Sequence, residues 1–133
     1  MTFPDPARSS YLPALVVDFN GDAAIQLAQQ LSHFGFPVDI AGSSETALAS
    51  ARAKRYHSVV MVADLTREID LECLTGLRRK ARSAWIIVVS STPCTHPEQI
   101  IHRCGADSLL IAPFTVEELA NRLSAFSRRS RPP

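Results

Sequence analysis

Short apolar runs alternate with longer segments of helical periodicity along nearly the whole chain. Each short run is a continuous stretch of mostly apolar residues, which is typical of a strand buried on both faces of a parallel sheet. Between these runs, apolar residues recur every three or four positions, as they do on the buried face of a helix. The five predicted strands cover Ala14–Val17, Val38–Ala41, Ser58–Ala63, Trp85–Val89 and Leu109–Ala112.

The segments between the strands carry helix end signals. The turn Asn20–Asp22 is expected to cap the first helix and Gly35 to close it, while Ser43 or Ser44 caps the second. A capping box, Thr115–Glu118, opens the last helix. Five strands alternating with five helices predict one α/β domain with a parallel sheet covered on both faces. The predicted helices cover Ala24–Phe34, Ser44–Arg55, Asp70–Arg82, Pro97–Cys104 and the segment from Thr115 to Phe126.

Composition narrows the class of protein further. The chain has 133 residues, of which 46% are hydrophobic, so it suits one folded domain rather than a disordered segment. We expect a leader at 1–12, the domain at 13–129 and a tail at 130–133. Three cysteines do not make a disulfide framework, and no apolar run is long enough for a membrane span, so a cytoplasmic protein is predicted.

Net charge and motif spacing exclude several functions. The formal net charge is +1, and the basic segments Arg78–Arg82 and Arg128–Arg131 have no interleaved aromatic residues, so we interpret them as solvated and expect no nucleic-acid binding. Cys94 and His96, followed by His102 and Cys104, suggest zinc ligands. On a helix, however, positions 102 and 104 lie about 200° apart and cannot converge on one ion. No nucleophile elbow or phosphate-cradling loop is present, so no enzyme is predicted.

Polar residues mark the carboxyl ends of the predicted strands, where parallel sheets place their functional sites. Several short fragments at and near these ends have an order and spacing that resemble a response-regulator receiver domain over residues 13–129. The resemblance implies a flavodoxin-like (βα)5 fold and a role in two-component signalling. The fragments are Leu15–Asp18, Gly35–Phe36, Gly105–Asp107, Pro113–Thr115 and Glu117–Leu119.

The resemblance also implies which residues occupy the phosphorylation site. A working receiver has two acids after the first strand for Mg²⁺, an acceptor Asp after the third, a Ser or Thr after the fourth, and a Lys before the Pro that follows the fifth. Here these positions hold Asp18 with Phe19, Ser90, and Ala112 before Pro113. A phenyl ring cannot bind a hard cation, and the fixed ammonium group is absent.

The acceptor position depends on register. Counting without gaps from Tyr56 forward, or from Leu77 backward, places Val62 there, and the register of a buried strand resists slippage. Asp64 takes the position only if two residues are inserted before the site and two are deleted after it. In either register the site is degenerate, with Asp18 left as a lone candidate Mg²⁺ ligand or as a cap for the first helix.

These residues predict a freestanding pseudo-receiver that acts through protein contact and needs no cofactor. The alternative is an atypical receiver that a histidine kinase phosphorylates on Asp64 in the presence of Mg²⁺. The partner is a histidine kinase, another signalling protein or a second copy. By resemblance to one receiver subfamily, docking is expected on the fourth helix, fifth strand and fifth helix, through the charges of Asp107 and Arg122 and through Leu109. A local Glu118–Arg122 ion pair is the simpler interpretation of the second charge.

Overall fold

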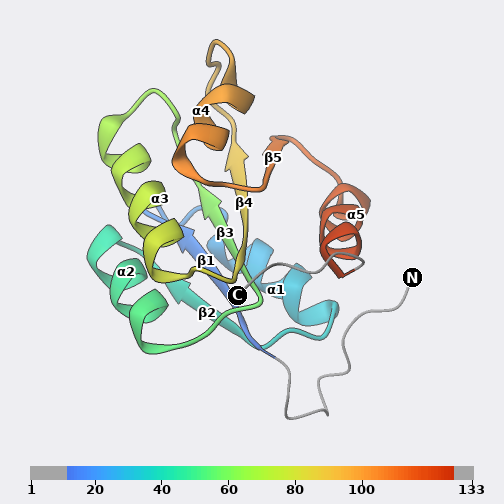
Figure 1. Cartoon of the computed structure of the whole chain (residues 1–133). Coiled ribbons are helices and arrows are strands. Elements are labelled where there is room, and N and C mark those ends of the chain that lie inside the picture. The colour runs from blue at the N-terminus through green and yellow to red at the C-terminus, as the bar shows by residue number, and fades with distance from the viewer. Residues whose placement is uncertain (1–11, 128–133) are drawn as a thin grey trace.

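A computed structural model describes residues 12–127 of the chain (Figure 1). Five parallel strands form one sheet in the order β2-β1-β3-β4-β5. The strands are β1 (Ala14–Asp18), β2 (Val38–Ala41), β3 (Ser58–Val62), β4 (Trp85–Ser90) and β5 (Ser108–Ile111). The helices between them are α1 (Ala24–His33), α2 (Ser44–Ala53), α3 (Glu68–Lys80), α4 (Pro97–Cys104) and α5 (Val116–Ser127). The predicted flavodoxin-like (βα)5 fold is therefore confirmed.

The two faces of the sheet carry separate apolar cores. Because side chains alternate along a strand, Leu15 and Val17 face α2, α3 and α4, whereas Ala14 and Val16 face α1 and α5. All four residues are fully buried. Burial on both faces explains why the strands read as continuous apolar runs rather than as alternating ones.

Most of the helix end signals are confirmed. The Ser43 hydroxyl accepts a 3.1 Å hydrogen bond from the Thr46 N–H at the start of α2. The capping box before α5 is reciprocal: the Thr115 N–H donates to Glu118 Oε1 at 3.1 Å, and the Glu118 N–H donates to Thr115 Oγ1 at 3.1 Å. Gly105 ends α4, and its φ of 92° lies in the left-handed region that glycine adopts readily.

Several helix ends differ from the prediction, among them the end of α2, which lies at Ala53 rather than at Arg55. The turn 20–22 does not cap α1, whose N-cap is Ala23 and has no side-chain hydrogen bond of its own. The helix α3 begins at Glu68 and ends at Lys80, two residues earlier at each end than predicted. At its amino end, Glu68 and Asp70 both lie in the first turn, where acidic side chains interact favourably with the helix dipole.

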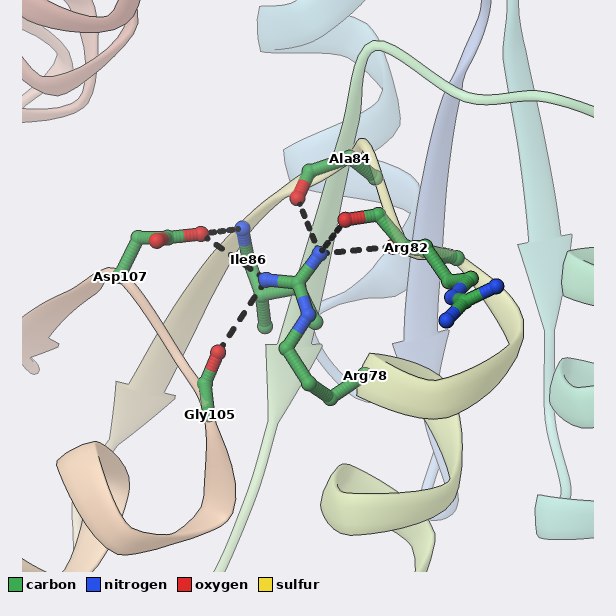
Figure 2. A network of polar contacts seen from close by, with 7 residues as sticks. Arg78, Arg82, Ala84, Ile86, Gly105 and Asp107 are labelled. Atoms are coloured by element: carbon green, nitrogen blue, oxygen red, sulfur yellow. Dashed lines mark hydrogen bonds and ion pairs between the residues drawn. The ribbon is translucent and has the colours of Figure 1, made fainter. Parts of the chain in front are cut away.

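A largely buried arginine, Arg78, joins α3 to the α4–β5 turn (Figure 2). Arg78 pairs with the carboxylate of Asp107 at 3.2 Å, and Asp107 also accepts a 2.8 Å hydrogen bond from the Ile86 N–H. The same guanidinium donates to four backbone carbonyls, those of Ala81, Arg82, Ala84 and Gly105. One side chain therefore satisfies the end of α3 and fixes the entry into β5.

Within the described residues, no helix is both long and apolar enough to span a bilayer. Most of the predicted leader and the whole predicted tail lie outside the described residues, as do Arg128, Arg129 and Arg131.

Candidate functional site

The carboxyl ends of β1, β3, β4 and β5 lie side by side. The sheet pairs Asp18 with Val62 and Val62 with Val89. In the next pair of strands, Ser90 lies beside Ile111, and the Ala112 N–H donates to the Ser90 carbonyl at 2.8 Å. The fold thus brings together the residues that the sequence singled out at these strand ends.

Asp18 is a structural carboxylate at the end of β1. Its side chain is 3% exposed and accepts hydrogen bonds from the backbone N–H groups of Asn20 at 3.2 Å and Ala23 at 2.8 Å. Both oxygens are therefore engaged by the loop that leads into α1. This geometry agrees with the cap interpretation, with Asp18 taking the role that the turn 20–22 was expected to fill.

The positions around Asp18 are apolar. Val62 lies directly across from it in the sheet, at the last position of β3. Phe19 follows it and packs against the core shared by α2, α3 and α4. A carboxylate, a valine and a phenyl ring do not form a hard-cation site, which requires several oxygen ligands.

Asp64 lies in the loop beyond β3, two residues after the position opposite Asp18. Its carboxylate accepts hydrogen bonds from the hydroxyl and the backbone N–H of Thr66, and the bond to the hydroxyl, followed by the bond to the backbone, lowers the pKa of Asp64. Asp64 is therefore ionised near neutral pH and closes a local turn with Thr66.

A second acid, in the first turn of α3, was missed in the sequence. Asp70 is 4% exposed, and its Oδ2 accepts a 2.8 Å hydrogen bond from the Asp64 N–H. Its position in the first turn of α3 could have indicated a structural role, because acidic side chains there interact favourably with the helix dipole. Asp70 therefore fixes the course of the chain between β3 and α3.

A hollow of about 290 Å³ occupies the space between α1 and the ends of β3, β4 and β5. None of the residues that line it is charged, and Ala112, which precedes Pro113, is one of them. Ser90 is 1% exposed, and its hydroxyl points to the Thr92 carbonyl at 3.4 Å. The lining residues are Ala23, Gln26, Leu27, Gln30, Val62, Val89, Ser91, Ala112, Pro113 and Phe114.

Metal ligands do not cluster in the described part of the chain. Across residues 12–127, no three His, Cys, Asp or Glu side chains are placed to share an ion. Cys94, His96, His102 and Cys104 thus form no tetrahedral set in this fold. Cys94 and Cys104 instead pack against the core between the sheet and α2, α3 and α4.

Comparisons with known proteins agree with this geometry, although no protein-family model matches the chain. Response regulator ArlR of Staphylococcus epidermidis is 28% identical over 115 residues, which cover 86% of this chain and 52% of ArlR. Transcriptional regulatory protein PrrA of Mycobacterium tuberculosis is 30% identical over 115 residues, covering 86% of this chain and 49% of PrrA. The chain spans about half the length of these curated relatives.

Solved structures show the same fold. The chemotaxis protein CheY4 of Vibrio cholerae superposes with a TM-score of 0.76 at 20% identity, covering 88% of this chain and 99% of CheY4. HP1043, an orphan response regulator of H. pylori, gives a TM-score of 0.75 at 21% identity, covering 94% of this chain and 100% of HP1043. The chain is a response-regulator receiver domain.

The receiver's α4–β5–α5 face differs in detail from the sequence prediction. The Asp107 carboxylate binds Arg78 and the Ile86 N–H within the same chain. Leu109 packs against the core, whereas Ile111, two residues further along β5, is 55% exposed. Ile111 is therefore more exposed than Leu109, although both residues line the groove between α4 and α5.

Arg122 retains a place on this face of the receiver. Its guanidinium donates to the Leu109 carbonyl at 3.4 Å, while Glu118 is engaged in the capping box with Thr115. The local Glu118–Arg122 ion pair does not form in the described structure. Arg122 lines a groove of about 570 Å³ between α4 and α5, together with Glu98, Ile101, His102, residues 106–111 and Glu118.

Proposed function

We propose that this receiver domain is a pseudo-receiver, which signals in the cytoplasm through protein contact and catalyses no reaction of its own. The observation that carries the proposal is the pairing of Asp18 with Val62 at the end of the sheet. The residue across from the retained acid has no group that can take up a phosphoryl group. We assign the domain to residues 13–129.

Phosphoryl transfer to a carboxylate depends on charge neutralisation at the equatorial oxygens. In a receiver this comes from a Mg²⁺ ion and a fixed ammonium group. The two positions that would supply them here are Phe19 and Ala112, and the hollow beside Ala112 has an uncharged lining. Asp18, the remaining acid, has both oxygens bound by backbone N–H groups.

The test is phosphorylation by acetyl phosphate in the presence of Mg²⁺, followed by intact-mass measurement. We expect the mass of the wild-type chain to stay unchanged. The matched control is the variant Phe19→Asp/Val62→Asp/Ala112→Lys, which restores the three missing groups and is expected to gain one phosphoryl group. A wild-type chain that gains the group itself would refute the proposal.

The competing function is phosphorylation of Asp64 by a histidine kinase, with Mg²⁺ as cofactor. The observation in its favour is that Asp64 lies two residues beyond the end of β3 and is held ionised by Thr66. Against it, the Asp64 carboxylate already closes a turn, and the residue lies beyond the strand end that pairs with Asp18. Loss of an added phosphoryl group in Asp64→Asn would establish this alternative.

We further infer that partners dock on the α4–β5–α5 face. The groove there is lined by the cation Arg122 and by the exposed side chain of Ile111, together with the acids Glu98, Asp107 and Glu118. An exposed charge alone contributes about 0–1 kcal/mol, so apolar burial around Ile111 must supply most of the binding energy. The partner is another signalling protein, such as a histidine kinase, or a second copy bound across a two-fold axis.

Light scattering at high protein concentration tests self-association through this face. Ile111→Asp and Arg122→Asp are expected to shift a dimer to monomer. Ile25→Asp is the matched control, because Ile25 is 68% exposed on α1, away from the groove. A monomeric wild type whose native partner tolerates both groove variants would contradict the assignment.

A further inference from the structure

A second hollow lies at the opposite end of the sheet from the degenerate site. It has a volume of about 180 Å³ and is formed by residues 51–56 and 80–84, which come just before β3 and β4. Its lining includes the carboxyl ends of α2 and α3, two helices that Figure 1 shows next to each other. It is therefore independent of the acceptor site and of the α4–β5–α5 face.

Positive charge is concentrated in this hollow. The described part of the chain holds ten Lys and Arg residues, and five of them line it, although its volume is small. No acidic residue lines it. These five come from two segments about 25 residues apart, which explains why neither segment alone pointed to a site. They are Arg52, Lys54, Arg55, Lys80 and Arg82.

Most of this charge is uncompensated. Lys54 binds Asp39 at 2.8 Å, and Asp39 also accepts a 2.8 Å hydrogen bond from the Tyr56 hydroxyl. These two bonds, with that from Lys54 the stronger influence, lower the pKa of Asp39. Among the described residues, no carboxylate lies within ion-pairing distance of Arg52, Arg55, Lys80 or Arg82.

The end of α3 does not neutralise these cations either. Cations near a helix carboxyl end commonly bind its last carbonyl groups. Here Arg78 binds the carbonyls of Ala81 at 2.7 Å and Ala84 at 2.7 Å from inside the fold. Figure 2 shows the side chain of Arg82 turned away from the Arg78 guanidinium. These exposed cations are therefore available to bind an anion that is not part of the chain.

We propose that this hollow binds a small anion that carries two or more phosphate groups. Guanidinium groups bind phosphate oxygens through paired hydrogen bonds, and three of the five cations are arginines. The hollow is concave and small, which suits a compact oligophosphate better than a nucleic-acid strand. The only aromatic residue in its lining, Tyr56, is buried and presents no face for base stacking.

Calorimetric titration of the full chain with inorganic triphosphate tests the proposal. We expect one molecule to bind, and Arg55→Gln and Arg82→Gln each to weaken binding by about tenfold or more, because each removes a charge-assisted contact. The matched control is Arg103→Gln, an exposed arginine on α4 outside the hollow, which should change affinity by less than about twofold. Absence of binding, or an equal loss in Arg103→Gln, would overturn the proposal.

Two further ligands separate the possible sources of phosphate. Sulfate at equal ionic strength should bind far more weakly than triphosphate, since it offers a single anionic group. A short DNA duplex should also bind more weakly, because the hollow does not follow a backbone. If sulfate matches triphosphate, the site is a general counterion surface; if the duplex binds more tightly and Arg103→Gln weakens it, the surface belongs to nucleic acid. Either result overturns the assignment.

Discussion

Replacement of Arg78 by alanine is the most informative perturbation of the fold. The Arg78 side chain is 19% exposed, and that of Asp107 is 17% exposed, so the pair is largely removed from water. The guanidinium also serves backbone carbonyls at the end of α3 and in the α4–β5 turn, as Figure 2 shows. Its removal therefore leaves both a carboxylate and several carbonyls without their charged donor.

The expected cost is large relative to the stability of a domain. Breaking one side of a buried ion pair costs about 3–5 kcal/mol, out of a total of about 5–15 kcal/mol for a typical domain. We expect about 3–4 kcal/mol for Arg78→Ala, toward the lower end, for two reasons. Asp107 keeps its bond to the Ile86 N–H, and exposed Arg82 lets water reach its carbonyl.

Urea denaturation followed by circular dichroism measures this free energy. Arg79→Ala is the matched control, because Arg79 is the exposed neighbour and its loss should change stability by less than about 0.5 kcal/mol. A loss below about 1 kcal/mol in Arg78→Ala would show that water replaces the guanidinium at little cost, and the assigned role of the network would be wrong.

Gly105 provides an independent check through a double-mutant cycle. A Cβ at this position would lie 2.5 Å from Arg78 Cγ, and the backbone φ of 92° is itself unfavourable for alanine. Gly105→Ala should therefore be costly in the wild type and cost only about 1–2 kcal/mol, from the backbone alone, in Arg78→Ala. Equal costs in both backgrounds would mean that the side chain is not packed against the turn.

Three further predictions concern the loops and the termini of the sheet. Asp18→Ala should lower the free energy of unfolding by about 2 kcal/mol, and Asp18→Asn by less, because the amide oxygen still accepts from one of the two N–H groups, those of Asn20 and Ala23, that the carboxylate binds. Millimolar Mg²⁺ should raise Tm by less than about 1 °C, since a ligand stabilises only by binding the native state; a rise of several degrees that Asp18→Asn abolishes would contradict this. Burial lowers the pKa of His57, whose ring packs 4.9 Å from that of Phe36, so the unfolded chain takes up a proton first and stability should fall from about pH 7 to pH 5. The slope in that range, measured by urea denaturation, should be shallower in His57→Phe, and an unchanged slope would count against His57 as its source.

The fold was predictable because its signals are local. Continuous apolar runs identified the strands, and the caps at Ser43 and Thr115 identified helix starts from hydrogen bonds that span three residues. Alternation of the two element types then leaves few topologies, since crossovers between parallel strands are right-handed. Errors were confined to the ends of elements, where Asp18 rather than the turn 20–22 supports α1.

Contacts between segments that are distant along the chain could not be predicted from the sequence. Arg78 and Asp107 are 29 residues apart, and nothing in the sequence of either indicates that they pair. The same limit applies to the basic hollow, where the residues before β3 and before β4 become neighbours only through the sheet. Asp107 was assigned to an outer surface because helix and strand patterns show which face a side chain occupies, not which partner it finds there.

The residues at the strand ends, as the pseudo-receiver proposal interprets them, are mutually consistent in physical terms. A lysine at position 112 would place a cation in the hollow that Ala112 shares with Val62, whose lining contains no carboxylate. An acid at 62 beside Asp18 would be a second negative charge with neither Mg²⁺ nor lysine to balance it. Removing the acids and the cation together avoids both costs, because an unpaired buried charge is more unfavourable than an apolar replacement. Asp18 can remain without a positively charged partner because its carboxylate accepts hydrogen bonds from two backbone N–H groups. The retained acid therefore supports the fold of the β1–α1 loop, and its presence alone is no evidence that the chemistry of a working receiver persists.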